Sequence, residues 1–290
     1  MIKKICQWLD ARSGPPGPGP DKFLTDAVDP RHTGLVDSVK NGWFLQQSDE
    51  LFRGFKVKQG QSLLDVGAGT GTVSHFAAQR RCRVTYTDIN SEAVDALGAR
   101  LEAAGFGPNS EGVVSNSDPL PLASDSYDKI VCLEVLEHTT NPRQCMTELF
   151  RVGKPGAQYL LSVPGERGEN IQKSYAPKLY FDAPNHLHVF SKPDFESLVE
   201  DSGLVVEKYD TTGFYWFLWM SLYWIEQKQN GVELTGAALD KVEPPYSPLL
   251  QKWSTLWHEV LKNPHSEAMR RHLDDLLPKS QIIIATKPEA

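Results

Sequence analysis

The 290-residue sequence has no apolar run close to the roughly 20 residues that a membrane-spanning helix needs. Lys3 and Lys4 near the N-terminus are followed by too few apolar residues for the core of a secretory signal peptide. Both absences argue against export or a membrane anchor. We therefore expect a cytoplasmic protein.

A net positive charge is also lacking. The chain has 30 Lys and Arg against 37 Asp and Glu, a formal net charge of −7. Proteins that bind a phosphate backbone usually present a basic surface. A tight basic cluster, Arg80, Arg81 and Arg83, falls in a predicted turn, where it is expected to be solvated. The charge therefore argues against a nucleic-acid partner.

The sequence has few cysteines, and their spacing shows no paired motif. The four cysteines, Cys6, Cys82, Cys132 and Cys145, form no Cys-x-x-Cys pair. Two fall in predicted buried strands, where cysteine behaves as a small apolar residue. We expect free thiols in a reducing compartment rather than a disulfide framework.

Glycine, in contrast, is concentrated in Leu63-Leu64-Asp65-Val66-Gly67-Ala68-Gly69-Thr70-Gly71-Thr72, which reads as a buried strand, a tight turn and the start of a helix. Glycines let the backbone turn sharply and approach a ligand closely. The N-terminus of the following helix would direct free N–H groups at an anionic group. The pattern predicts a nucleotide-type cofactor site. A dinucleotide fingerprint would place its third glycine where Thr72 stands, whereas this chain has it at Gly71.

Three further segments follow in order. Residues 82–88 read as a second strand ending in Asp88, roughly 20 residues after the glycines, where a carboxylate can accept both ribose hydroxyls. Asp88 could instead cap the next helix, but Asn90 or Ser91 already serves there. Residues 120–138 hold a Leu-Pro turn, a Tyr-Asp pair opening another strand, and a Leu-Glu-His. Residues 151–164 hold an Arg-Val-Gly-Lys-Pro-Gly turn into a further strand.

In this order the four motifs resemble those of the class I S-adenosylmethionine (SAM) methyltransferases, over roughly residues 55–210. The general similarity is to quinone-type and sugar-type O-methyltransferases. The resemblance implies an α/β fold with a doubly wound, Rossmann-like seven-stranded sheet, and SAM as the cofactor. It implies cofactor contacts from Asp65, Gly67, Ala68, Gly69, Gly71, Asp88, Ile89, Asn116, Ser117, Asp118, Leu133 and Glu134.

The resemblance also assigns roles within this set. Asp65 would anchor the loop or the cofactor amino group, and Asp88 would hold the ribose with Ile89 against the adenine face. Leu133 and Glu134 would border the methionine end. One position departs from the family pattern, because an Asp usually precedes the Leu-Pro pair by four residues and this chain has Asn116 there. Either the Asn116 carbonyl or the carboxylate of Asp118 could accept from the adenine amino group, with Ser117 between them.

The chain divides into four parts by pattern. Residues 1–20 end in a Gly-Pro-rich, non-helical stretch that reads as a flexible N-terminal segment. Residues 21–58 are expected to form a small helical cap containing Trp43, Phe44 and Leu45. The core is expected over 59–212 and 280–290. Residues 213–279 form a helical insertion between the sixth and seventh strands, where relatives usually have a short hairpin.

The insertion opens with Phe214-Tyr215-Trp216-Phe217-Leu218-Trp219-Met220-Ser221-Leu222-Tyr223-Trp224-Ile225, which is apolar on every side of a helix. Such a helix could be buried against the core or at a dimer interface. It could instead line a pocket for a large apolar acceptor. A membrane-surface contact is less favoured, because the surrounding insertion is not basic. Two amphipathic helices, 248–262 and 266–277, are expected to complete a lid.

Methyl transfer from a sulfonium requires mainly alignment and exclusion of water, and a hydroxyl acceptor also needs a base. Histidine is the natural base near neutral pH. The candidates are His186, His188 and His138, all placed by the resemblance near the ends of the fourth and fifth strands. His186 and His188 with Asp182 show no further ligand for a metal, and we predict none.

The sequence thus predicts a SAM-dependent methyltransferase acting on a small or lipid-like acceptor, preferentially at oxygen. A small-molecule N-methyltransferase is the alternative among enzymes. A methyltransferase-like protein that binds SAM and regulates or scaffolds a partner is the alternative outside them. A nicotinamide-dependent enzyme is disfavoured by Thr72 and by the downstream motifs.

Overall fold

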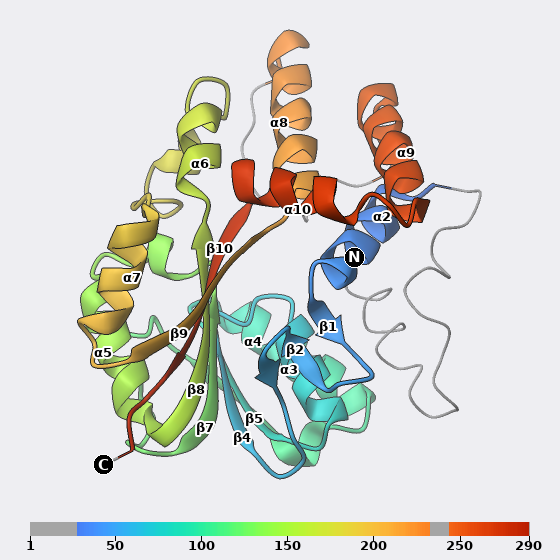
Figure 1. Cartoon of the computed structure of the whole chain (residues 1–290). Coiled ribbons are helices and arrows are strands. Elements are labelled where there is room, and N and C mark those ends of the chain that lie inside the picture. Colours follow the sequence, from blue (N-terminus) through green and yellow to red (C-terminus); the bar gives the residue numbers. More distant parts are fainter. Residues whose placement is uncertain (1–27, 233–243, 290) are drawn as a thin grey trace.

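The computed structural model describes residues 28–232 and 244–289 (Figure 1). Its central sheet is formed by β4 (Ser62–Val66), β5 (Arg83–Asp88), β6 (Ser110–Val114), β7 (Tyr127–Leu133), β8 (Gly153–Pro164), β9 (Val205–Thr212) and β10 (Ser280–Thr286). The strand order is β6-β5-β4-β7-β8-β10-β9. The pairings from β6 to β8 are parallel, and β10 is antiparallel to both of its neighbours. The predicted seven-stranded α/β sheet is confirmed.

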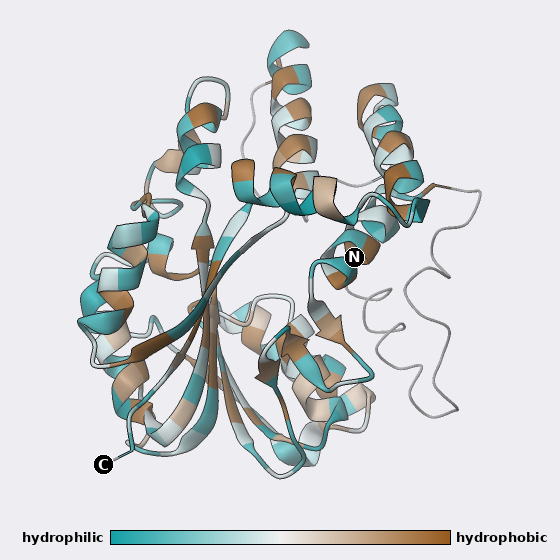
Figure 2. Cartoon of the chain, viewed as in Figure 1, coloured by the Kyte–Doolittle hydropathy of each residue, from teal (hydrophilic) through white to brown (hydrophobic). Residues whose placement is uncertain are grey.

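Helices cover both faces of this sheet because alternate residues of the central strands are buried in opposite directions. Leu63 packs in one layer with Phe76 and Leu97, whereas Leu64 packs in the other with Met146 and Phe195. These layers are built from α3 (Thr72–Gln79) and α4 (Ser91–Ala103) on one face and α5 (Pro142–Val152) and α7 (Lys192–Glu200) on the other. Figure 2 shows the apolar residues running along the central strands.

The segment before the core differs from the expected helical cap. Among the described residues of this segment, 28–58, α2 (Pro30–Lys40) is the only helix, and the aromatic residues after it lie on a three-stranded antiparallel sheet. Its strands are β1 (Trp43–Leu45), β2 (Glu50–Phe52) and β3 (Phe55–Lys56). The chain turns at Gly42, Asp49 and Gly54, which have φ of 104°, 61° and 98°. These left-handed residues interrupt any helix, so the prediction was wrong for this stretch. Residues 1–27 lie outside the described chain.

The insertion between β9 and β10 is helical, as predicted. It contains α8 (Phe214–Gln229), α9 (Pro248–Lys262) and α10 (Glu267–Leu276). In Figure 1, α8 and α9 stand above the sheet beside α6 (Glu166–Gln172), and α10 lies across the end of the sheet. Residues 233–243 lie outside the described chain.

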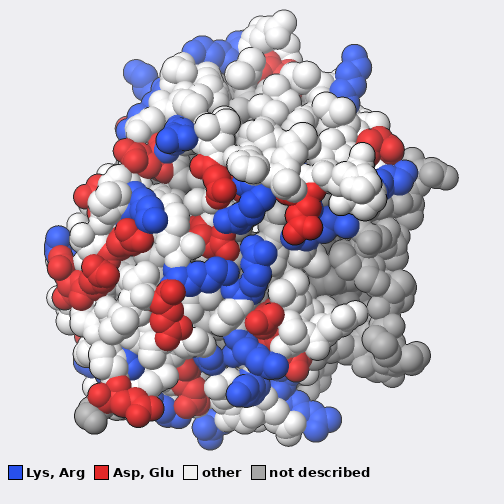
Figure 3. Space-filling view, in the orientation of Figure 1, with Lys and Arg blue, Asp and Glu red and all other residues white. Residues whose placement is uncertain are grey.

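Burial within the chain accounts for much of the apolar surface of α8. Tyr215, Trp219 and Trp224 are all buried, in a third hydrophobic cluster that includes Trp257 of α9 and Val36 of α2. On the face shown in Figure 3, acidic and basic side chains are interspersed over the sheet, and the upper part is largely uncharged. None of the helices that could be described is both long and apolar enough to cross a membrane.

Candidate active site

The glycine loop joins β4 to α3 and requires glycine for steric reasons. Gly67 and Gly71 have φ of 66° and 76°, in the left-handed region that other residues rarely adopt. A Cβ on Gly67 would lie 2.3 Å from Cγ2 of Val135, and one on Gly71 would lie 2.1 Å from Cδ1 of Leu97. The loop is therefore packed against the chain on one side. Such a cradle, closed to side chains, fits a cofactor that must approach the backbone.

Asp65 holds the start of α3. Gly71 at the N-terminus of the helix has no side chain to cap it, and the buried Asp65 carboxylate accepts from Ser74 N at 3.1 Å and Ser74 Oγ at 2.6 Å. Burial raises the pKa of Asp65 to about 7, although both bonds from Ser74 oppose this rise. Of the two predicted roles, anchoring the loop is the one that these contacts support.

Asp88 ties the end of β5 to the glycine loop. One carboxylate oxygen accepts from Gly69 N at 2.9 Å, and the other accepts from Asn90 N at 2.9 Å. The cap of α4 is provided by Asn90, whose side chain accepts from Glu92 N. Asp88 is therefore not the helix cap. Each oxygen keeps a second acceptor position, so the carboxylate can still take ribose hydroxyls.

The residues predicted to meet the adenine lie next to Asp88, and most of them are exposed. Ile89 is 74% exposed, so its apolar side chain offers a face on which an aromatic ring can lie. Asn116 uses its carbonyl oxygen to accept from Asp118 N at 3.1 Å, which leaves one acceptor position on that oxygen. Ser117 is buried, with a left-handed φ of 65°. The Asp118 side chain is exposed, so either residue is sterically able to meet an adenine amino group.

Leu133 and Glu134 lie where β7 ends. Glu134 Oε1 accepts from Ser162 Oγ at 2.9 Å, and Oε2 accepts from Lys279 Nζ at 2.9 Å. Burial on its own would raise the pKa of the Glu134 carboxyl, but Lys279 and Ser162 outweigh it and hold that pKa below its ordinary value. Leu133 packs, partly buried, against the layer that contains α3 and α4.

Two of the three predicted histidines come together beyond the ends of β7 and β8. The rings of His138 and His186 lie edge to face with centroids 5.0 Å apart. His186 Nδ1 donates to Glu169 Oε1 at 2.5 Å, and Tyr180 packs on the same ring with centroids 4.1 Å apart. The Glu169 bond fixes the ring orientation and leaves Nε2 as the proton acceptor of the neutral ring.

His188 does not belong to this histidine pair and has a different contact. Its Nε2 lies 3.0 Å from the carbonyl oxygen of Thr139, and a ring nitrogen facing a carbonyl must donate. This bond ties the segment after β8 to the end of β7. Its geometry favours a structural role for His188 over the catalytic role that the sequence also predicts.

Glu137 is a buried acid next to the histidine pair. Its side chain is fully buried, and within the described chain neither carboxylate oxygen has a hydrogen-bond partner. Burial, and then the neighbouring Glu134 carboxylate, raise the pKa of Glu137 well above its ordinary value. Burial and the neighbouring His186 lower the pKa of His138. The donor atoms of Glu137, His138 and His186 lie within 4.8 Å of one another.

The sequence pattern missed several of these residues. Glu169, Tyr180 and Lys279 are brought to the histidines and to Glu134 by α6, by a short 3₁₀ helix (Lys178–Phe181) and by the residue before β10. Glu137 stands inside the Leu-Glu-His motif, so a search for acids beside the candidate histidine would have found it. Lys279 gives no local signal, because its partner Glu134 is 145 residues away in the chain.

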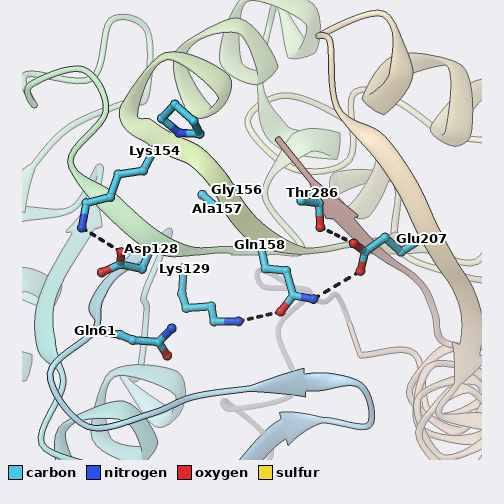
Figure 4. Close-up of a pocket in the computed structure, with 10 residues that line it drawn as sticks. Gln61, Asp128, Lys129, Lys154, Gly156, Ala157, Gln158, Glu207 and Thr286 are labelled. Carbon is cyan, nitrogen blue, oxygen red and sulfur yellow. Dashed lines mark hydrogen bonds and ion pairs between the residues drawn. The ribbon is translucent and has the colours of Figure 1, made fainter. Parts of the chain in front are cut away.

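A cavity of about 330 Å³ lies at the ends of the strands opposite to the glycine loop (Figure 4). Its polar side chains pair with one another, because Lys129 donates to Gln158 at 2.5 Å and Gln158 donates to Glu207 at 3.2 Å. Lys154 donates to Asp128 at 2.7 Å. This cavity is separate from the glycine loop and the histidines.

A family model described as a methyltransferase domain matches residues 45–209. A ubiquinone biosynthesis O-methyltransferase of Erwinia tasmaniensis is 29% identical over 128 residues, which cover 44% of this chain and 49% of that protein. A ubiquinone/menaquinone biosynthesis C-methyltransferase of Bartonella quintana is 30% identical over 130 residues, covering 44% and 48%. The matches thus span about half the length of these relatives.

Solved structures support the fold. The [4+2]-cyclase SpnF superposes with a TM-score of 0.55 at 16% identity, covering 89% of this chain and 82% of that one. This likeness shows the architecture alone, because proteins that share a fold can differ in chemistry. The family model covers more than half of the chain and includes the glycine loop, Asp88 and the histidine pair. The chain therefore belongs to the methyltransferase-domain family.

Proposed function

We propose that this protein is a SAM-dependent methyltransferase that transfers a methyl group to a small or lipid-like acceptor, preferentially at oxygen. The observation that carries the proposal is the glycine cradle beside Asp88. An acid–base cluster, formed by Glu137, His138 and His186, lies at the same end of the sheet. The glycine cradle would lie beside the methionine part of SAM, Asp88 would hold the ribose, and Asn116, Ser117 or Asp118 would meet the adenine. Leu133 and Glu134 would border the methionine end. When bound, SAM supplies an activated methyl group on its sulfonium.

The proposed base is His186. A hydroxyl acceptor must give up its proton when it is methylated, and the neutral imidazole nitrogen of His186 would take this proton. Glu169 holds Nδ1 and would stabilise the imidazolium that forms. The lowered pKa of His138 keeps that ring neutral beside His186, so it does not repel the new charge. The raised pKa of Glu137 favours its neutral form, which limits the negative charge beside the two histidines.

The acceptor class follows from the surroundings of this cluster. Tyr180 contacts both His186 and Trp224 of α8, so one aromatic ring separates the proposed base from the aromatic side chains of the insertion. An apolar acceptor fits such surroundings better than a charged one does. Two of the relatives are named for ubiquinone biosynthesis, one as an O-methyltransferase and the other as a C-methyltransferase, and these names support a lipid-like acceptor.

A protein that binds SAM without turnover is the second candidate. The observation that favours it is the low exposure of the His186 side chain, 9%, which limits access of an acceptor to the base. The two candidates share the cofactor site and differ only in acceptor methylation.

The first experiment is calorimetric titration of the purified protein with SAM, with NADH as the control ligand. Asp88→Ala is expected to weaken SAM binding about tenfold or more, a loss of about 1.4 kcal/mol. Asp95→Ala is the matched control, because Asp95 lies exposed on the neighbouring α4. No SAM binding by protein freed of bound ligand contradicts the proposal. Binding without methylation of any hydroxylated apolar acceptor favours the second candidate.

A further inference from the structure

Glu134 occupies an unusual backbone position. It has a φ of 54°, in the left-handed region that is uncommon for residues other than glycine. Its amide donates to the Ser162 carbonyl at 3.0 Å, and Ser162 Oγ holds one of its carboxylate oxygens. Left-handed side-chain residues persist where their surroundings hold them, and such positions are found at binding sites. The orientation of the Glu134 carboxylate is therefore set by its partners.

The partner on the other carboxylate oxygen is Lys279, which is a fixed point of the fold. Its amide donates to the Thr212 carbonyl at 2.9 Å, and its carbonyl accepts from Gly165 N at 3.0 Å. Gly213 packs so closely on it that a Cβ there would lie 2.8 Å from Lys279 Cβ. Lys279 thus joins the ends of β8, β9 and β10 at the point where the insertion returns to the sheet.

The contacts leave Glu134 able to bind a ligand. Each carboxylate oxygen has two acceptor positions, and the bonds from Ser162 and Lys279 occupy one on each oxygen. The free positions suit a cationic group such as an amino group. The side chain of Glu134 is 31% exposed, so a ligand can reach it.

We propose that Lys279 is a positioning residue for the cofactor: it keeps Glu134 ionised and oriented toward the amino group of SAM. Lys279, the last residue of the insertion, thereby sets the lower pH limit for cofactor binding. This inference rests on the proposed function, in which Glu134 borders the methionine end of SAM.

The charges around Glu134 give the direction of the effect. Besides Lys279, the titratable groups that interact with Glu134 are His186, Glu137, His138 and Tyr180. Burial favours the protonated acid. Lys279 supplies the largest opposing interaction. Without it, Glu134 would take up a proton at a higher pH and lose its attraction for a cationic amino group.

The test measures the Kd for SAM at pH 5.5 and at pH 8.5 by calorimetry. The quantity compared is the Kd at pH 5.5 divided by the Kd at pH 8.5. Lys279→Met is expected to raise this ratio at least fivefold over the wild-type value, and Lys279→Arg to restore it. Lys262→Met is the matched control, because Lys262 lies in the same insertion and pairs with Glu259 on the surface. If Lys279→Met does not fold, Lys279→Gln replaces it.

The pathway through Glu134 is tested in the same assay. In a Glu134→Gln background, Lys279→Met is expected to leave the ratio unchanged. An equal rise of the ratio in both backgrounds would overturn the inference, and so would an unchanged ratio in Lys279→Met alone. If the wild type fails to bind SAM, or Asp88→Ala does not weaken binding, the cofactor assignment fails instead.

Discussion

The glycine loop and the helical cover lie at the same end of the sheet but are built in opposite ways. The helical cover consists of α6, the 3₁₀ helix after it, and α8 to α10. The loop is held by partners close in sequence, as when Asp65 accepts from Ser74, nine residues away. The cover is held by partners far apart, as when Trp257 Nε1 donates to Asp37 at 2.8 Å, 220 residues away. Hydrogen bonds between near neighbours thus hold the start of α3 at the glycine loop, whereas distant contacts hold the helical cover and bring Lys279 to Glu134.

The largest expected effect is on kcat. It tests whether His186, which Glu169 of the helical cover holds in place, acts as the base. His186→Gln is expected to lower kcat about 10²- to 10⁴-fold, the usual contribution of a positioned base, because the proton acceptor is lost. SAM affinity should stay near the wild-type value, since the glycine loop is unchanged. Steady-state kinetics and calorimetry measure the two quantities.

His188→Gln is the control for this prediction. It replaces the imidazole that bonds Thr139 but leaves the His186–Glu169 pair intact, so it should lower kcat far less than His186→Gln does. Equal kcat losses in the two variants would contradict the assignment of His186 as the base.

The next effect is on stability, and it tests the packing of the loop. Gly67→Ala is expected to lower the free energy of unfolding by about 3 kcal/mol, because a left-handed φ and a contact with Val135 both oppose a Cβ. Gly60→Ala is the matched control, with a φ of 83° and no atom within 4 Å of the added Cβ. It should cost only about 1 kcal/mol. Urea denaturation gives both values, and equal losses would mean that close packing at Gly67 contributes nothing.

The smallest effect is on the pH dependence of stability. It concerns Asp37 of α2, which accepts a hydrogen bond from Trp257 of the helical cover. Burial, and next the nearby Asp274, raise the pKa of Asp37 to about 7 from 3.8. The folded state therefore binds more protons than the unfolded state between these values. The contribution of Asp37 to stability is complete below about pH 4 and is lost as the pH rises toward 7, by no more than about 1.4 kcal/mol per unit.

Asp37→Asn should flatten this part of the stability curve. The curve comes from urea denaturation at a series of pH values between 4 and 8. Asp65 and Asp274 shift in the same direction and keep part of the slope in the variant. A slope that is unchanged by Asp37→Asn would show that Asp37 does not titrate in this range.

Prediction from sequence succeeded where the signal was local. The strand, glycine turn and helix around Gly67 lie where expected, as do the helices of the insertion, because apolar periodicity and glycine placement act over a few residues. It failed at Trp43 to Phe52, where aromatic residues suit strands as well as helices and the turns at Gly42 and Gly54 decided between them. The roles of the cofactor-binding residues, and the absence of a metal, remain predictions.

The sequence by itself determined the α/β class, the family and the position of the glycine loop beside Asp88, since each depends on short motifs in a fixed order. Only the tertiary structure brought Glu169 to His186 and Lys279 to Glu134. Neither pair has a spacing that a periodic pattern can encode, because the partners belong to separate elements that meet only when the sheet and the insertion pack together. The physical reason is that side-chain pairing across elements depends on the relative placement of whole strands and helices, which no short stretch of sequence specifies.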